Sequence, residues 1–423
     1  MRRPDRKYLS WFFLTGFVLC ANFSWAQNNT SPYSMLGIGD IESSYFNRTS
    51  GMANTGIAIR NNRYSILNNP ASLTAMDDQF FSFELALRGR YINYTGADIV
   101  PGNSTSRDFS VKRLSLAIKA NKWWGTGVGF MPFSVSNYLF SAQKFIQGTT
   151  ESTPALYEGT GGVNQVYWAN GIKIGKHISA GVSLAYLFGS LSQTESVASS
   201  SIATALITTN EIYLHSPYFS GGAQYYTGIG KHWDLTIGGT YNRKATLKAE
   251  YSSKVSTTAT DTLSYAITNN NYFKLPEGYG AGISLVKDKK YSFTADYRFQ
   301  NWSALQEKGN QYALVNSNRY SAGFEISQKR ITWGNFLVES MFYQAGLFYS
   351  NSYLQINNQQ ISEKGFTAGL GFNSKRNAMG VAFALEVGQR GTTTSNLIKE
   401  TATSFSMTIS YRDFWNTKGK KYD

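Results

Sequence analysis

The feature that most constrains this chain is a two-residue alternation of large apolar side chains with small or polar ones, which begins near Gln79. The alternation is explicit in residues 81–88, 113–119, 381–388 and 404–411. This period is typical of β-strands that have one apolar face. After the first 26 residues, no apolar run reaches the ~18 residues that a membrane helix needs. The sequence therefore predicts an all-β protein.

The connections between the expected strands alternate between long and short. Long ones are expected near residues 96–106, 141–161, 196–207, 253–270, 307–318, 357–360 and 391–400, and short ones near 122–124, 175–177, 230–232, 287–290, 328–334 and 375–377. Outer-membrane barrels have short periplasmic turns and longer extracellular loops. Seven long and six short connections predict a transmembrane antiparallel β-barrel of about 14 strands, with both termini in the periplasm. A soluble sandwich or propeller, the alternative, gives no reason for this asymmetry.

The composition fits a barrel wall between lipid and water. The chain is 42% hydrophobic and holds 28 Tyr and 27 Phe, yet its mean hydropathy is −0.30. Half of each strand would face lipid and half a polar lumen, which keeps the mean hydropathy low. The formal net charge is +14. The cations are scattered and form no basic helix, so we expect no nucleic-acid partner.

The first 26 residues have the pattern of a secretory signal peptide. Arg2, Arg3, Arg6 and Lys7 precede an apolar stretch at 8–21, and Ser24-Trp25-Ala26 gives a small-x-small cleavage site. The alternative is an N-terminal anchor helix. The only cysteine, Cys20, lies within this leader. The mature chain, expected to start at Gln27, would therefore have no disulfide and no thiol chemistry.

Residues 27–78 are expected to form a hatch, or plug, inside the barrel. Residues 48–78 contain many small residues, paired asparagines and an Asn69-Pro70-Ala71 step, and most of this stretch has neither helical nor strand periodicity. Such a segment cannot span a membrane, but it can fill the lumen of a barrel. The remaining divisions are the barrel itself, residues 79–415, and a polar periplasmic tail, residues 416–423.

Two motifs resemble the FadL family of outer-membrane channels for long-chain fatty acids and other hydrophobic molecules. The run from Gly51 to Gly56 and the step Asn69, Pro70, Ala71 just before the first strand are similar to the FadL hatch. Pro132 and Phe133 in the third strand are similar to the position where the FadL wall is kinked inward and leaves a lateral hole. Proline cannot donate to a β-ladder, so a break in pairing is expected there on physical grounds too. An ordinary bulge with no opening is the alternative.

The resemblance implies passive uptake of fatty-acid-like molecules, which would leave the lumen sideways through a gap at the third strand. The alternative is a FadL-fold, PorV-like component of type IX secretion that binds secreted proteins. Expected partners are outer-membrane lipid, the hydrophobic substrate and the barrel-insertion machinery, the last through the aromatic stretch at 411–415. A monomer is expected, because a closed barrel needs no oligomer.

Charged residues within the expected strands should face the lumen, where they can pair with one another and hold the hatch. These residues are Glu84, Arg88, Arg113, Asp296, Arg298, Glu386 and Arg412. Selection of the substrate is a second role open to them. The mature chain has three histidines and no cysteine, so no metal site, cofactor or catalytic residue is predicted. An esterase would need a hydroxyl nucleophile, a histidine and an acid that converge.

Overall fold

The computed structural model describes residues 31–96, 99, 104–145, 152–197, 205–257, 262–309, 311–331, 337–374 and 377–415. The expected signal peptide and the expected tail at 416–423 lie outside these residues. No helix in the described part of the chain is both long and apolar enough to cross a membrane.

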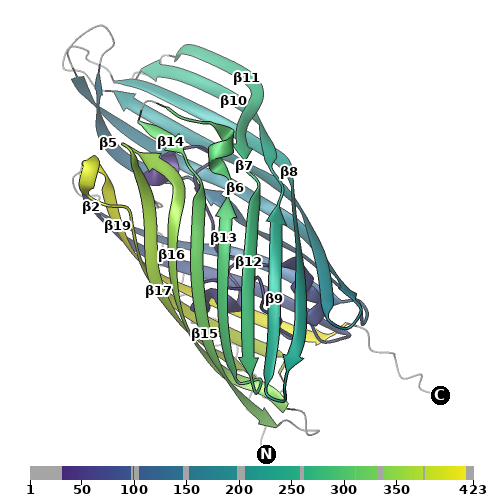
Figure 1. The fold of residues 1–423 in the computed structure, drawn as a ribbon. Coiled ribbons are helices and arrows are strands. Elements are labelled where there is room, and N and C mark those ends of the chain that lie inside the picture. The colour runs from purple at the N-terminus through teal and green to yellow at the C-terminus, as the bar shows by residue number, and fades with distance from the viewer. Residues whose placement is uncertain are drawn as a thin grey trace, which may run out of the picture.

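The strands form one antiparallel sheet that closes into a barrel, because the last strand pairs with the first strand of the wall (Figure 1). The wall strands are β2 (Phe80–Gly96), β3 (Thr105–Lys119), β4 (Trp124–Val135), β5 (Tyr138–Phe145), β6 (Ser152–Ile174), β7 (Ile178–Val197), β8 (Leu206–Ile229), β9 (Trp233–Asn242), β10 (Ala245–Thr257), β11 (Thr262–Leu275), β12 (Gly278–Lys287), β13 (Tyr291–Gln300), β14 (Tyr312–Leu314), β15 (Ser317–Ile331), β16 (Leu337–Ile356), β17 (Gln359–Asn373), β18 (Met379–Arg390) and β19 (Ile398–Phe414).

Four wall positions are each occupied by two strand segments in succession. β4 and β5 both pair with β6, β9 and β10 both pair with β8, and β14 and β15 both pair with β16. β11 and β12 pair with β10 and β9 respectively. Each such pair is one interrupted strand, so the described wall has 14 positions. The predicted 14-stranded antiparallel barrel is confirmed.

Several of the expected long loops are strand instead. β5 continues to Phe145 and β6 begins at Ser152, while β10 continues to Thr257 and β11 begins at Thr262. Residues 357–358 form a two-residue turn in which both asparagines have positive φ, as tight hairpins require. The predictions of long loops at 141–161, 253–270 and 357–360 were therefore wrong. β6 and β8 have 23 and 24 residues, many more than the ~9–11 that cross a bilayer, so their polar ends continue as hairpins beyond it.

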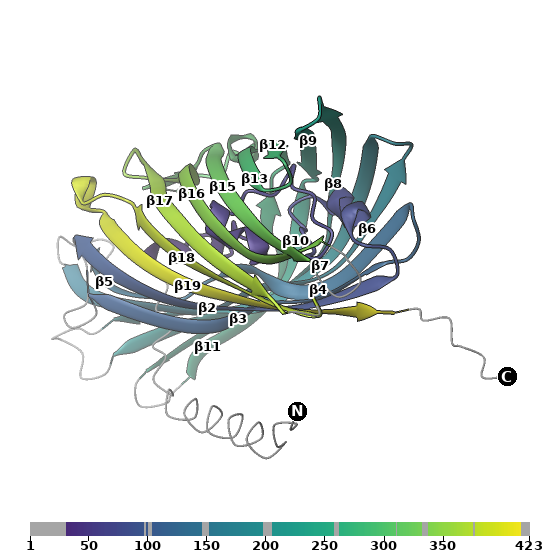
Figure 2. The same cartoon turned by 90° about the horizontal axis from the view of Figure 1, so that it is seen from below.

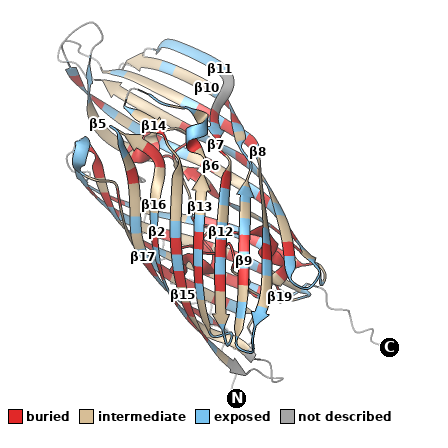
Figure 3. Ribbon diagram, viewed as in Figure 1, coloured by how far each residue is buried: buried red, intermediate tan, exposed pale blue. Residues whose placement is uncertain are grey.

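The two faces of the wall differ as the alternation predicts. On β13, Thr294 and Asp296 are buried while Phe293 and Tyr297 are exposed, and the same alternation is visible on neighbouring strands in Figure 3. Exposed tyrosines form a row across five strands towards the end opposite the short turns: Tyr241, Tyr279, Tyr297, Tyr320 and Tyr349. Aromatic rows of this kind mark the boundary between lipid and water in membrane barrels.

Residues 31–78, which we call the inner segment, run through the interior of the barrel (Figure 2). The segment contains η1 (Pro32–Met35), β1 (Asp40–Ile41), η2 (Arg48–Met52) and η3 (Pro70–Ala75). The backbone of the inner segment lies closest to the wall where the wall strands have glycines. A Cβ on Gly346 would lie 2.5 Å from the backbone nitrogen of Ala53, and one on Gly181 would lie 2.5 Å from that of Ala71. No other residue type fits at these two points of contact.

Candidate functional site: the divided lumen and the seam

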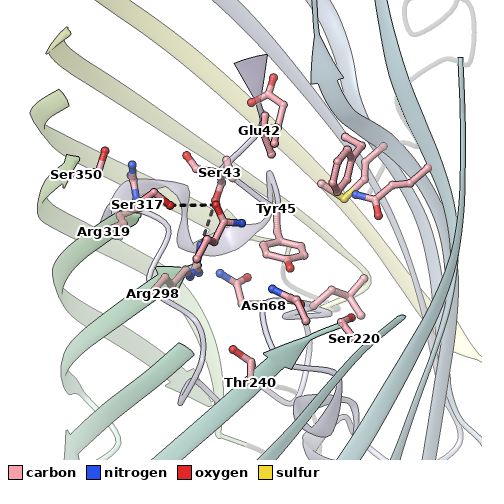
Figure 4. Close-up of a pocket in the computed structure, with 18 of the residues that line it drawn as sticks. Glu42, Ser43, Tyr45, Asn68, Ser220, Thr240, Arg298, Ser317, Arg319 and Ser350 are labelled. Atoms are coloured by element: carbon pink, nitrogen blue, oxygen red, sulfur yellow. Dashed lines mark hydrogen bonds between the residues drawn. The ribbon is translucent and has the colours of Figure 1, made fainter. Parts of the chain in front are cut away.

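The inner segment separates two cavities within the barrel. The upper cavity, of about 280 Å³, lies towards the end opposite the short turns (Figure 4). The lower cavity, of about 1660 Å³, is lined in part by the turns at Lys176 and Lys289. The two cavities share no lining residue among those described. The inner segment contributes lining residues to both cavities.

The upper cavity is strongly charged. Figure 4 shows Ser43 and Tyr45 of the inner segment beside Arg298 of the wall. Its lining contains four basic and four acidic residues: Asp40, Glu42, Arg90, Arg298, Arg319, Glu363, Glu386 and Arg390. Towards the same end of the barrel, η1 belongs to a buried apolar cluster that includes Tyr33, Ile38, Leu187, Phe273 and Trp302. A charged chamber therefore lies next to an apolar cluster.

The wall is interrupted between β3 and β4. Their pairing runs from Lys119 and Gly125 to Leu114 and Phe130 and then stops. Residues 105–113 of β3 still pair with β2, but no other described strand pairs with their opposite edge. We call this interruption the seam.

Beyond the seam, β4 pairs with the inner segment. Ile41 lies opposite Ser134 and Asp40 opposite Val135, and the backbone N–H of Glu42 donates to the carbonyl of Phe133 at 3.0 Å. The register of β4 against β6 is irregular between Pro132 and Ser134. The structure thus places Pro132 and Phe133 at the point where β4 changes its partner from β3 to β1. Phe133 also lines the upper cavity.

Glu42 connects the other edge of the seam to the inner segment. Its carboxylate accepts from Arg88 on β2 at 3.0 Å and from Lys112 on β3 at 2.7 Å. Lys112 is the extra residue of a β-bulge, because Ala86 pairs with Arg113 and Leu87 with Val111. Burial alone would raise the pKa of Glu42, but the charges of Arg88 and Lys112 outweigh it and lower the pKa to about 2. Glu42 is therefore an anion at neutral pH.

Most of the predicted lumen charges contact the inner segment. Glu84 accepts from the backbone of Ser65 at 2.7 Å, and Arg113 donates to the Ser65 hydroxyl at 2.6 Å. Asp296 accepts from the backbone nitrogens of Gly56 and Ile57. The remaining contacts are Arg88 with Glu42, Arg298 with the carbonyls of Ser43 and Asn54, and Arg412 with Asp77. Glu386 lines the upper cavity instead.

Arg48, which sequence reasoning did not single out, is the most completely paired cation of the inner segment. It donates to Glu325 at 2.6 Å and to Glu339 at 2.7 Å, and its guanidinium lies 3.8 Å from the centre of the Phe342 ring. Burial alone would lower the pKa of Arg48, but the two carboxylates outweigh it and raise that pKa well above its usual range. The signal in the sequence was a lone arginine within an otherwise uncharged stretch.

The Asn69, Pro70, Ala71 step begins η3. The Asn69 side chain accepts from the backbone N–H of Ala71 at 3.1 Å and so caps the helix, while Pro70 occupies the first turn. The side-chain amide of Asn69 also donates to the carbonyls of Ile57 and Ala223, at 2.9 and 3.1 Å. Asn69 therefore fastens η3 both to the inner segment and to β8.

The described residues contain no group of three or more His, Cys, Asp or Glu side chains that could hold a metal ion. His232 contacts Asp288 at 2.6 Å in an exposed position between two turns, and His177 contacts the carbonyl of Tyr226 at 3.0 Å. His215 lies on β8, with its ring centre 6.5 Å from that of Tyr186.

This barrel, with a segment held inside it, has the fold of FadL-like outer-membrane proteins. Similar solved structures include a Pseudomonas aeruginosa FadL homologue (12% identity, 90% of this chain and 100% of the other, TM-score 0.62). Another is the P. putida toluene transporter TodX, with 14% identity over 88% of this chain and 99% of the other, at a TM-score of 0.60. A third is the Ralstonia pickettii toluene transporter TbuX, with 14% identity over 87% of this chain and 98% of the other, at a TM-score of 0.56. At these identities the likeness shows the fold.

The chain belongs to the BamG family, whose model matches residues 9–423. A search of curated proteins gave no match. The predicted resemblance to FadL is confirmed at the level of the fold.

Proposed function

We propose that this protein is an outer-membrane channel for passive uptake of hydrophobic small molecules, and that these leave the lumen through the seam between β3 and β4. The observation that carries the proposal is the change of partner of β4, which leaves β3 for the inner segment beyond Phe130. The similar structures titled as toluene transporters support the substrate class.

A lateral exit suits this lumen because the axial path is polar. An apolar solute moving along the axis would meet the charged upper cavity and then the ion-paired inner segment. Unpaired backbone groups in lipid cost several kcal/mol each. An interrupted ladder therefore persists only where a polar cavity or a covering segment satisfies those groups. Beside the seam, Phe109 and Val111 are exposed on the outer surface, by 67% and 55%. An apolar solute that leaves there enters lipid directly.

β1 is the element whose movement would open the seam. It holds β4 through backbone pairing, and Glu42 next to it holds β2 and β3 through ion pairs. Release of β1 removes both connections at once. Nothing in this mechanism requires an energy source, so the flow follows the concentration gradient.

A reversible cross-link tests the proposal, because the mature sequence contains no cysteine. Ile41→Cys with Ser134→Cys joins two residues that lie opposite each other, a separation that a disulfide can span. In proteoliposomes, uptake of radiolabelled toluene should fall to background when this variant is oxidised and recover with reductant. Ala382→Cys with Thr408→Cys, a pair on β18 and β19, is the matched control and should transport in both states. Equal uptake by the oxidised and reduced Ile41/Ser134 variant would refute the lateral route.

The second candidate, a PorV-like barrel that binds secreted proteins, is favoured by two observations. The upper cavity is charged rather than apolar, and buried ion pairs fasten the inner segment to the wall, as they would in a permanently sealed bore. Native mass spectrometry of the extracted protein separates the two functions. A bound apolar molecule supports the channel, and a co-purifying secreted protein with an empty lumen supports the binding role.

A further inference from the structure

The lower cavity carries an excess of positive charge that the fold does not neutralise. Eight basic and five acidic residues line it. Arg48 is paired with Glu325 and Glu339, and Arg412 with Asp77. The other six basic residues make no ion pair with a carboxylate in the described part of the chain: Arg60, Arg63, Lys176, Lys289, Lys290 and Lys329. Only Asp234 and Asp413 remain among the acidic lining residues to offset them.

Two of these cations belong to the inner segment itself, where Arg60 is half-buried and Arg63 is buried. Arg60 donates to the side chains of Ser179 and Gln224, both at 2.9 Å, and lies over the Tyr226 ring at 3.8 Å. All of these partners are neutral. Burial lowers the pKa of the Arg60 guanidinium, because the charge has lost water without gaining a carboxylate.

Arg63 is the more incompletely satisfied of the two. It is only 3% exposed, and it donates to the carbonyl and side-chain oxygens of Asn377 and to the carbonyl of Ala378. Its Nε is buried and has no hydrogen-bond partner. Burial lowers the pKa of Arg63 as well. A buried cation with no carboxylate partner and one unsatisfied donor is costly.

We propose that the lower cavity binds an acidic polypeptide segment, which enters from the mouth at the short turns. The lysines at the mouth and the arginines deeper within are donors at successive depths, as an extended chain of carboxylates would need. The volume, about 1660 Å³, exceeds the roughly 300–1,000 Å³ of small-molecule sites. The arginines lie within the barrel, so a flat bilayer surface reaches only the exposed lysines at the mouth. This inference does not depend on the proposed transport.

This chain's own C-terminal end does not have the chemistry of the occupant. The eight residues after Trp415 contain three lysines and one aspartate, so they carry a net positive charge. The occupant that we propose is a segment of another protein, on the side of the membrane that the short turns face. In barrels of this type that side is the periplasm.

The test uses full-length mature protein in neutral detergent and fluorescein-labelled hexaglutamate as the probe, with anisotropy as the readout. We expect saturable binding that weakens as salt is added. Lys289→Gln with Lys290→Gln removes two exposed cations at the mouth and should raise the Kd about fivefold. Arg63→Gln should weaken binding further. Lys248→Gln with Lys254→Gln, an exposed pair on β10 at the other end, removes the same charge and should change nothing.

Three outcomes would overturn the proposal. The first is equal loss of affinity in the Lys289/Lys290 and Lys248/Lys254 variants, which would mean attraction to the net charge alone. The second is competition by inorganic phosphate at concentrations that match the peptide, which would mean a site for single anions. The third is binding to phosphatidylglycerol vesicles without binding to the peptide, which would mean a lipid surface site.

Discussion

Neutralising Glu42 should release β1 from the seam. Glu42 is 11% exposed and has a pKa of about 2, against a usual value of 4.5. At 1.36 kcal/mol per pKa unit, this difference corresponds to about 3 kcal/mol of stabilisation at neutral pH. The loss of about 3 kcal/mol in Glu42→Gln corresponds to an increase of about a hundredfold in the population of locally open states.

Hydrogen exchange of the backbone amides near residues 40–42 at pH 7 measures this opening. We expect about hundredfold faster exchange there in Glu42→Gln and little change elsewhere in the barrel. Glu250→Gln, an exposed carboxylate on β10, is the matched control and should leave these amides unchanged. In Glu42→Gln, Arg88 and Lys112 remain buried without their anion, so adding Lys112→Met should recover part of the protection. Exchange that accelerates less than threefold in Glu42→Gln would refute the assigned role of Glu42.

The pKa of Glu42 also determines how the stability of β1 at the seam depends on pH. The folded-state pKa of Glu42 lies below its unfolded value, so its stabilisation is fully present above pH 4.5. It is lost as the pH falls from 4.5 towards 2. The difference in protection between the unmodified protein and Glu42→Gln should therefore shrink across this window. A difference that stays constant down to pH 2 would contradict the depressed pKa.

Three further substitutions test the fastening of the inner segment. Arg48→Met leaves Glu325 and Glu339 buried without their cation and should destabilise the segment by about 3–5 kcal/mol, seen as faster proteolysis of residues 31–78. Asn69→Ala removes the cap of η3 and should cost about 1 kcal/mol in the same assay, so an effect as large as that of Arg48→Met would point to another role. Gly346→Val places a side chain against the Ala53 backbone and should displace the segment while the barrel remains heat-resistant on gels; an unchanged proteolysis pattern would contradict the contact.

The sequence was sufficient for the barrel because alternation is a local property. Each strand shows which residues face lipid, and the inward charges such as Arg113 and Asp296 follow from the same register. Pro132 could be located because a proline disturbs a β-ladder wherever it occurs. These inferences need no knowledge of what lies across the lumen.

The ion pairs between the inner segment and the wall could not be predicted from the alternation. Glu42 is one acid in an irregular segment, and its partner Lys112 is 70 residues away and faces inward only because a bulge adds a residue to β3. The sequence predicts loops at the polar ends of β6 and β10, because hairpins that leave the membrane lose the apolar face by which strands are recognised. Both errors arise where the neighbours of a residue come from distant parts of the chain.

The contacts of the inner segment also set an order of assembly. The first described residues bond to the last strand, since Ser31 and Tyr33 donate to Glu400 and Ile398 of β19, and Asp77 accepts from Arg412 of the same strand. The part of the chain made first therefore reaches its final position only when the part made last has arrived. An intermediate that lacks β19 would keep its N-terminal residues accessible to proteases and chaperones. Ser31, Tyr33 and Asp77 can therefore make these contacts only once the last strand of the wall is in place.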